Sequence, residues 1–411
     1  MTSYPTYRWV LICLYLMSNV SAQMVINTLG ILLPSISANV ESGGLGLSPS
    51  QQGLLGSAPF WSTIALAIPI AWAGSRLSPK WLTLITLVGC ALCLFMQGWA
   101  PVFAFLLLGR LLFGIFTIAQ QPARALLTRQ WFPAREVVLV NGLSNVFFGL
   151  VVGGGLALSP VILILLGDDW RGTLRIFAFY YVALAAIWLV MGRDRVTEEF
   201  SSGQSQPLLP LLRSALSHRD LWICGGGFAG ATMAFSAYVA FYPTFMLQEY
   251  DVSLRTSGIA LALDVILGGV GGLAIGYYAA TWRKEGLFLQ VLGIVMVGSF
   301  LGMILFDSVS IIFLMSIING VAWTFFPILI TVPFNLRGIQ PRQLAVAFSF
   351  VMMLISLGQA LGPLFIGFLE EATGNLKLTM FIASFTPLSL IIAGATLRFG
   401  RDPEPAPAAG D

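Results

Sequence analysis

The chain has 411 residues, of which 57% are hydrophobic and 9% charged, and its formal net charge is +3. Soluble domains carry about 25% charged residues, so this composition excludes a water-soluble enzyme of this length. A lipid bilayer is the solvent that fits it. The 21 Lys and Arg are scattered along the chain rather than clustered, which indicates no nucleic-acid partner.

Twelve apolar stretches of about 20 residues or more follow one another, separated by polar, Gly or Pro residues. They predict an all-α polytopic membrane protein with twelve transmembrane helices. The expected spans are 8–37, 48–73, 80–99, 101–127, 137–166, 172–191, 219–246, 255–280, 286–306, 309–335, 343–369 and 376–398.

The basic residues between the spans predict sidedness. With the N-terminus inside, sixteen Lys and Arg fall on the inner side and four on the outer side, which places both termini in the cytoplasm of a bacterial inner (plasma) membrane protein. A polar stretch divides the chain into an N-terminal six-helix half (1–192), a cytoplasmic linker (193–218) and a C-terminal six-helix half (219–400). We expect the Pro- and Ala-rich tail, 401–411, to be disordered.

An internal repeat relates the fifth and eleventh spans. The fifth contains Gly149-xxx-Gly153 and the eleventh contains Gly358-xxx-Gly362. Small residues four apart let helix backbones approach closely, so we expect both spans to pack against the other half and their glycines to take part in gating. Two related halves that meet across such faces are typical of alternating-access transporters.

The fourth span and the loop after it carry more specific motifs. Arg110 and Gly114 are followed by Pro122 and by a Trp-Phe-Pro-Ala-Arg-Glu run at 131–136. With the twelve spans and the repeat, these residues resemble the major facilitator superfamily, and most closely its organic-anion and anion:cation symporter branches, with cyanate-type permeases a related comparison. The resemblance implies two pseudo-symmetric halves and a cavity lined by spans one, four, seven and ten. We also expect a monomer.

The chain departs from the family pattern in two places. The loop after the second span keeps a Gly and the basic Arg76 and Lys80 but lacks the usual Asp, so these two gating candidates have no acidic partner within the loop. Organic-anion relatives often place a carboxylate seven residues after the span-four arginine, where this chain has Thr117.

Two ionisable residues lie deep in the predicted spans. Arg110 is about 13 Å and Asp264 about 12 Å from the outer side at the rise of an α-helix. Arg110 is an anion anchor or a structural arginine bonded to backbone carbonyls. Asp264 is a proton carrier, or a packing residue bonded to Asn141 or Asn145.

Three pairs of residues at i, i+4 spacing occupy the spans that line the cavity. They supply hydrogen-bonding or aromatic groups on one helix face, as a substrate site requires, although each pair also fits interhelical bonding. The candidate substrate-binding residues are Gln23 with Asn27, Tyr238 with Tyr242, and Asn319 with Trp323.

The expected function is a secondary active transporter of a small anionic organic solute, proton-coupled and working by alternating access. No nucleotide-binding loop is present, so transport runs on an ion gradient or on the solute's own gradient, and a proton gradient is the expected one. Cys90 and Cys93 form a CxxC motif far in sequence from the single His, and we expect no metal or other cofactor. The thirty Phe keep open an efflux pump for amphipathic or drug-like compounds. An intramembrane enzyme lacks the nucleophile and base it needs, and a non-transporting sensor is the remaining alternative.

Overall fold

A computed structural model describes residues 6–74, 77–133, 136–194, 217–282, 284–335 and 341–397, and these are almost entirely α-helical. The helices of the first part are α1 (Tyr7–Ser37), η1 (Val40–Ser42), α2 (Pro49–Gly74), α3 (Pro79–Gly98), α4 (Phe103–Ile118), α5 (Gln120–Trp131), α6 (Val137–Leu165) and α7 (Trp170–Met191). Those of the second part are α9 (Arg219–Tyr250), α10 (Leu254–Trp282), α11 (Glu285–Leu305), α12 (Val309–Ala322), α13 (Phe325–Leu329), η4 (Val332–Asn335), α14 (Pro341–Thr373), α15 (Leu376–Ala383) and α16 (Leu388–Thr396).

The twelve predicted spans are confirmed, and three of them are broken. Ten helical stretches are long and apolar enough to cross a membrane, and α2 and the shorter α4 complete the set. The breaks separate α4 from α5, α12 from α13 and α15 from α16. The helix before each break ends four or five residues before a proline, Pro122, Pro327 or Pro387. A proline ring clashes with the carbonyl four residues earlier, so a helix ends there.

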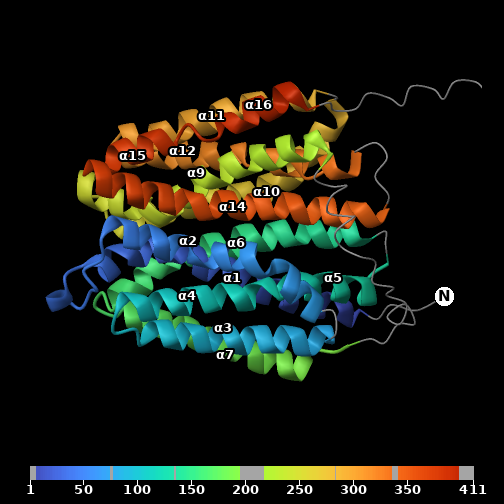
Figure 1. Cartoon of the computed structure of the whole chain (residues 1–411), viewed down its shortest axis with the longest axis horizontal. Helices are drawn as coiled ribbons and strands as arrows, with labels where there is room; N and C mark the ends of the chain where they lie inside the picture. The colour runs from blue at the N-terminus through green and yellow to red at the C-terminus, as the bar shows by residue number, and fades with distance from the viewer. Residues whose placement is uncertain are drawn as a thin grey trace, which may run out of the picture.

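The helices form two six-span halves, α1–α7 below and α9–α16 above in Figure 1. Matching hydrogen bonds support the repeat: the Tyr15 hydroxyl donates to the Gln120 carbonyl, and the Cys224 thiol donates to the Leu329 carbonyl at the same offset along the chain. The predicted linker lies mostly, and the predicted tail wholly, outside the described residues. The domain boundaries therefore stay predictions.

Three helix pairs join the halves: α2 with α14, α6 with α10, and α1 with α9. In Figure 1 these helices occupy the middle layer of the molecule. Gly149 and Gly153 lie against α10, where a methyl group on Gly153 would stand 3.0 Å from the carbonyl oxygen of Ala262. The backbones therefore touch, as the glycine spacing predicts.

The second glycine pair faces elsewhere. Gly358 and Gly362 pack against α9 of their own half, and it is Pro363 and Gly367 of α14 that meet α2. The eleventh span therefore packs against the other half as expected, but through Pro363 and Gly367 rather than through Gly358 and Gly362. Gly362 and Pro363 are neighbours on a helix, so they point about 100° apart, and one helix contacts α9 and α2 with adjacent residues.

The two ends of the bundle differ in how the halves meet. We call the end where α1 begins and α7 ends the linker end, and the opposite end the far end. At the far end, the Glu371 carboxylate of α14 accepts hydrogen bonds from the Ser50 backbone N–H (3.0 Å) and the Ser48 hydroxyl (3.3 Å). Ser50 belongs to the first turn of α2, whose N–H groups have no helical partner. One half thus caps a helix of the other.

Replacing Glu371 with Gln should weaken this contact, because the neutral amide loses its attraction to the positive end of α2. We expect the population with an open far end to rise by about threefold. Electron–electron distance measurements between spin labels at the exposed residues Val40 and Ala372 would detect this opening. Glu41→Gln, an exposed acid at the same end but in the short helix η1 of one half, is the matched control. An unchanged distance distribution in Glu371→Gln would mean that the contact does not hold this end closed.

Candidate functional site

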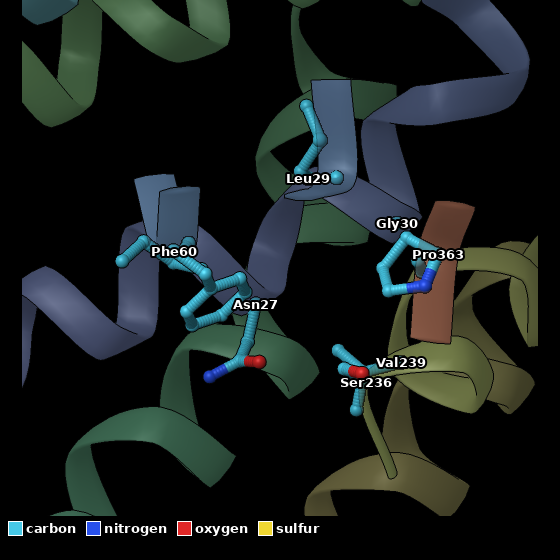
Figure 2. A pocket seen from close by; sticks show the side chains of 10 residues that line it. Asn27, Leu29, Gly30, Phe60, Ser236, Val239 and Pro363 are labelled. Atoms are coloured by element: carbon cyan, nitrogen blue, oxygen red, sulfur yellow. The ribbon is translucent and has the colours of Figure 1, made fainter. Parts of the chain in front are cut away.

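A small cavity lies between the halves at the level where they seal. Its volume is about 20 Å³, which holds about one water molecule and no organic solute. Figure 2 shows Asn27 and Phe60 on one side and Ser236, Val239 and Pro363 on the other. Gly30 closes it against Val239 of α9. The two halves are therefore nearly in contact at this level.

One face of α1 leads from this cavity toward the linker end. Asn19, Gln23 and Asn27 recur every four residues on the face that carries Gly30. Asn27 is buried at the cavity, whereas Asn19 and Gln23 remain partly exposed although α1 lies inside the bundle. The Asn27 amide donates to the Gln23 carbonyl at 2.8 Å. The N-terminal half thus presents a row of amides to the interface.

The facing helix, α9, offers a different surface. Below Ser236, the residues at helical spacing that keep some exposure are Met233, Ala229 and Gly226. None of the three carries a polar side chain. The two facing helices therefore differ: α1 presents amides, whereas α9 presents apolar groups below Ser236.

Arg110 lies behind the amide wall rather than in it. Its side chain is fully buried, and its Nε and Nη2 donate to the carbonyls of Leu55 on α2 and Ile26 on α1, each at 3.4 Å. Nη1 is buried with no hydrogen-bond partner among the described residues. The long carbonyl bonds match the structural alternative, whereas the unpartnered Nη1 is a donor that an anion could use. The described ion pairs, Arg8–Glu136 and Arg175–Asp169, do not include it.

Asp264 lies on the face of α10 that packs against α12. A methyl group on Gly320 of α12 would stand 2.5 Å from the carbonyl oxygen of Asp264. The side chain is 1% exposed, and its Oδ1 has no partner among the described residues. Asn145 is on α6, which packs on the other side of α10 near Gly269. The expected packing bond from Asp264 to Asn145 is therefore not formed, and the side chain of the other expected partner, Asn141, lies outside the described part of the chain.

Tyr238 and Tyr242 do not line the small cavity between the halves. Both are buried within their own half, where the Tyr238 hydroxyl bonds to the carbonyl of Phe300 (2.7 Å) and the Tyr242 hydroxyl to that of Met303 (3.2 Å), both on α11. This corrects their expected place in the cavity. The i, i+4 spacing identifies one face of α9 but not which neighbour that face meets.

Asn319 and Trp323 also do not line the small cavity, and they contact different helices. Asn319 is buried, and its amide donates to Ser299 of α11 at 2.8 Å, so it holds two helices of one half together. Trp323 caps α12 at the break and packs edge-to-face on Phe235 of α9, with ring centroids 5.0 Å apart. Its indole N–H has no partner among the described residues.

The predicted gating bases also differ in outcome. Arg76 lies outside the described residues. The Lys80 backbone N–H donates to Asp194 at 2.9 Å, just after α7, and its carbonyl accepts from Trp188. Asp194, at the start of the predicted linker, therefore bonds to the backbone in the first turn of α3 rather than to a basic side chain.

Two polar residues at the amide-bearing face of α1, Asn19 and Gln120, were not predicted from the sequence. Gln120 begins α5 immediately after the α4–α5 break and binds Asn19. The signals were available, because Asn19 extends the Gln23–Asn27 spacing by one turn and Gln120 stands two residues before Pro122.

Comparison with known proteins gives the same fold. A hexuronate transporter of Bacillus subtilis (strain 168) is 22% identical over 92% of each chain. A probable L-galactonate transporter of Escherichia coli (strain K12) is 25% identical over 59% of this chain and 56% of its own. A bacterial homolog of the human lysosomal transporter Spinster, solved in an inward-facing, unoccupied conformation, superposes with a TM-score of 0.74, 18% identity and 96% coverage of both chains.

The family model for the Major Facilitator Superfamily matches residues 15–341. This match covers most of the twelve spans, and it agrees with the two-half fold and with the relatives above. The chain therefore belongs to the Major Facilitator Superfamily of membrane transporters.

Proposed function

We propose that this transporter carries a small organic anion together with a proton, with both termini in the cytoplasm and a solute site at the midplane between the halves. One observation carries the proposal. Each half buries one ionisable side chain of opposite sign, Arg110 and Asp264, and each has a polar atom without a partner among the described residues. Buried charges are costly unless paired, so such groups are functional candidates within a membrane.

Arg110 is the proposed anion anchor. Its guanidinium holds the backbones of α1 and α2 through Ile26 and Leu55, and Ile26 itself lines the small cavity. A carboxylate that enters between these helices meets the free Nη1. Because a guanidinium stays charged and offers a planar set of donors, it selects an anion over a neutral solute.

Asp264 is the proposed proton carrier. A carboxyl in an apolar helix seam is neutral when protonated, and the neutral form removes the cost of the buried charge. The neighbouring helices α6 and α12 contain no Asp, Glu, Lys, Arg or His. Gain and loss of one proton is therefore the simplest charge change available to this seam.

The relatives support an acidic solute. The matched hexuronate and L-galactonate transporters act, by their names, on carboxylates that also carry hydroxyl groups. We propose a solute of this kind, a hydroxylated carboxylate, for this chain. Efflux of amphipathic compounds is the second candidate, favoured by the apolar face of α9 at Gly226, Ala229 and Met233. Saturable uptake of a hydroxylated carboxylate into proteoliposomes would decide for the first.

Arg110→Lys tests the anchor. Lysine keeps the charge, but its single nitrogen cannot replace the three separate nitrogens with which Arg110 contacts α1, contacts α2 and faces the anion, so we expect D-galactonate uptake into proteoliposomes to fall by about 30-fold. Arg175→Lys, in a half-exposed ion pair with Asp169, is the control and should keep its uptake. Full uptake by a well-folded Arg110→Lys variant would exclude the anchor.

Asp264→Asn tests the proton. The amide has nearly the shape of the carboxylic acid but carries no exchangeable charge, so a pH gradient should no longer drive accumulation, while solute exchange across the membrane persists. We expect accumulation to drop by about tenfold or more relative to exchange. Asp251→Asn is the control, because residue 251 has a positive φ of 53° that asparagine also tolerates. Proton-driven accumulation by Asp264→Asn would rule out this carrier.

A further inference from the structure

The break between α4 and α5 brings one glutamine against α1. Gln120 is the first residue of α5, and two groups of α1 hold it: the Tyr15 hydroxyl donates to its backbone carbonyl, and the Asn19 amide donates to its side-chain Oε1 at 3.1 Å. The Tyr15 hydroxyl also lies against the backbone of Arg124, one turn further along. The position of the Gln120 amide is therefore fixed by its neighbours.

The NH2 group of the Gln120 side chain has no hydrogen-bond partner among the described residues. A glutamine side chain offers two N–H donors as well as its carbonyl oxygen. Gln120 is 1% exposed, yet its Nε2 has no hydrogen-bond partner among the described residues. A buried donor without a partner costs free energy that burial of an apolar side chain would not. The contacts with α1 account for the two oxygens of Gln120 and leave Nε2 unexplained.

The unused donor adjoins the amide row of α1. Asn19, its partner, is partly exposed and is the first member of the row Asn19, Gln23 and Asn27 that ends at the small cavity. A solute group that reaches Asn19 from the space between the halves is next to the Gln120 amide. These side chains are uncharged and each can both donate and accept, which suits a hydroxyl group better than a carboxylate.

We propose that the Asn19–Gln120 pair, continued by Gln23 and Asn27, is the subsite that binds the hydroxyl groups of a polyhydroxylated carboxylate. This inference rests on the proposed function and adds a division of labour to it. Arg110 recognises the carboxylate, whereas the amides distinguish a hydroxylated carbon chain from a bare one. Asn19 meets the solute and positions Gln120, whose Nε2 donates to a solute hydroxyl oxygen.

A site built to bond hydroxyl groups should reject an analogue that lacks them, because its buried polar atoms are then left unpaired. The test compares D-galactonate with hexanoate, which has the same number of carbons and one carboxylate but no hydroxyls. Binding is measured by calorimetry on the full chain in nanodiscs, with empty nanodiscs subtracted. The variants are Gln120→Leu, Asn19→Ala and the control Gln97→Leu, a buried glutamine of α3 whose amide bonds to the Gly109 carbonyl.

We expect Gln120→Leu and Asn19→Ala to weaken D-galactonate binding by about 10-fold to 100-fold while hexanoate binding stays within about twofold of the parent chain. Gln97→Leu should leave both unchanged. Equal losses for both compounds, or no loss for D-galactonate, would overturn the subsite while leaving the anion transporter standing. A parent chain that binds neither carboxylate would overturn the proposed function and this inference with it.

Discussion

Contact between helix backbones across the two halves is the interaction on which the rest of this structure depends. Gly30 meets Val239, Gly153 meets Ala262, and α14 meets α2 at Gly367 and Pro363. In hydrocarbon the hydrophobic effect does not hold helices together, so close packing of small residues must do so. These contacts bring the amide face of α1 against α9 and reduce the space between them to one water-sized cavity.

The outline of the fold could be predicted from the sequence because hydropathy and proline chemistry are local. A run of apolar residues must form a helix in a bilayer, since no water is present to bond an exposed backbone. The three broken spans were read as continuous, although Pro122, Pro327 and Pro387 mark the breaks. Pro34, Pro160, Pro243 and Pro363 lie within unbroken helices, so a proline alone does not say which helices break.

The site was harder to predict, because a helix face has a direction only when its neighbours are known. Asn27 and Tyr242 occupy equally good i, i+4 pairs, yet Asn27 faces the other half and Tyr242 faces α11 of its own. Depth is different, because it depends on position along a single span. Arg110 and Asp264 could be singled out by counting along one span, and both side chains are buried in the bundle. Their bonding partners could be identified only once the packing of the helices was known.

The difference between the polar face of α1 and the apolar face of α9 affects how the two halves move past each other. Hydrogen bonds must be broken and re-formed when a polar surface slides, whereas an apolar surface exchanges one set of weak contacts for another. The face of α9 between Gly226 and Met233 has no side chain that could hold a hydroxyl group. A solute bound to the amides of α1 would therefore move with the N-terminal half. The C-terminal half would move past it, because this face of α9 offers no side-chain hydrogen bond to the solute.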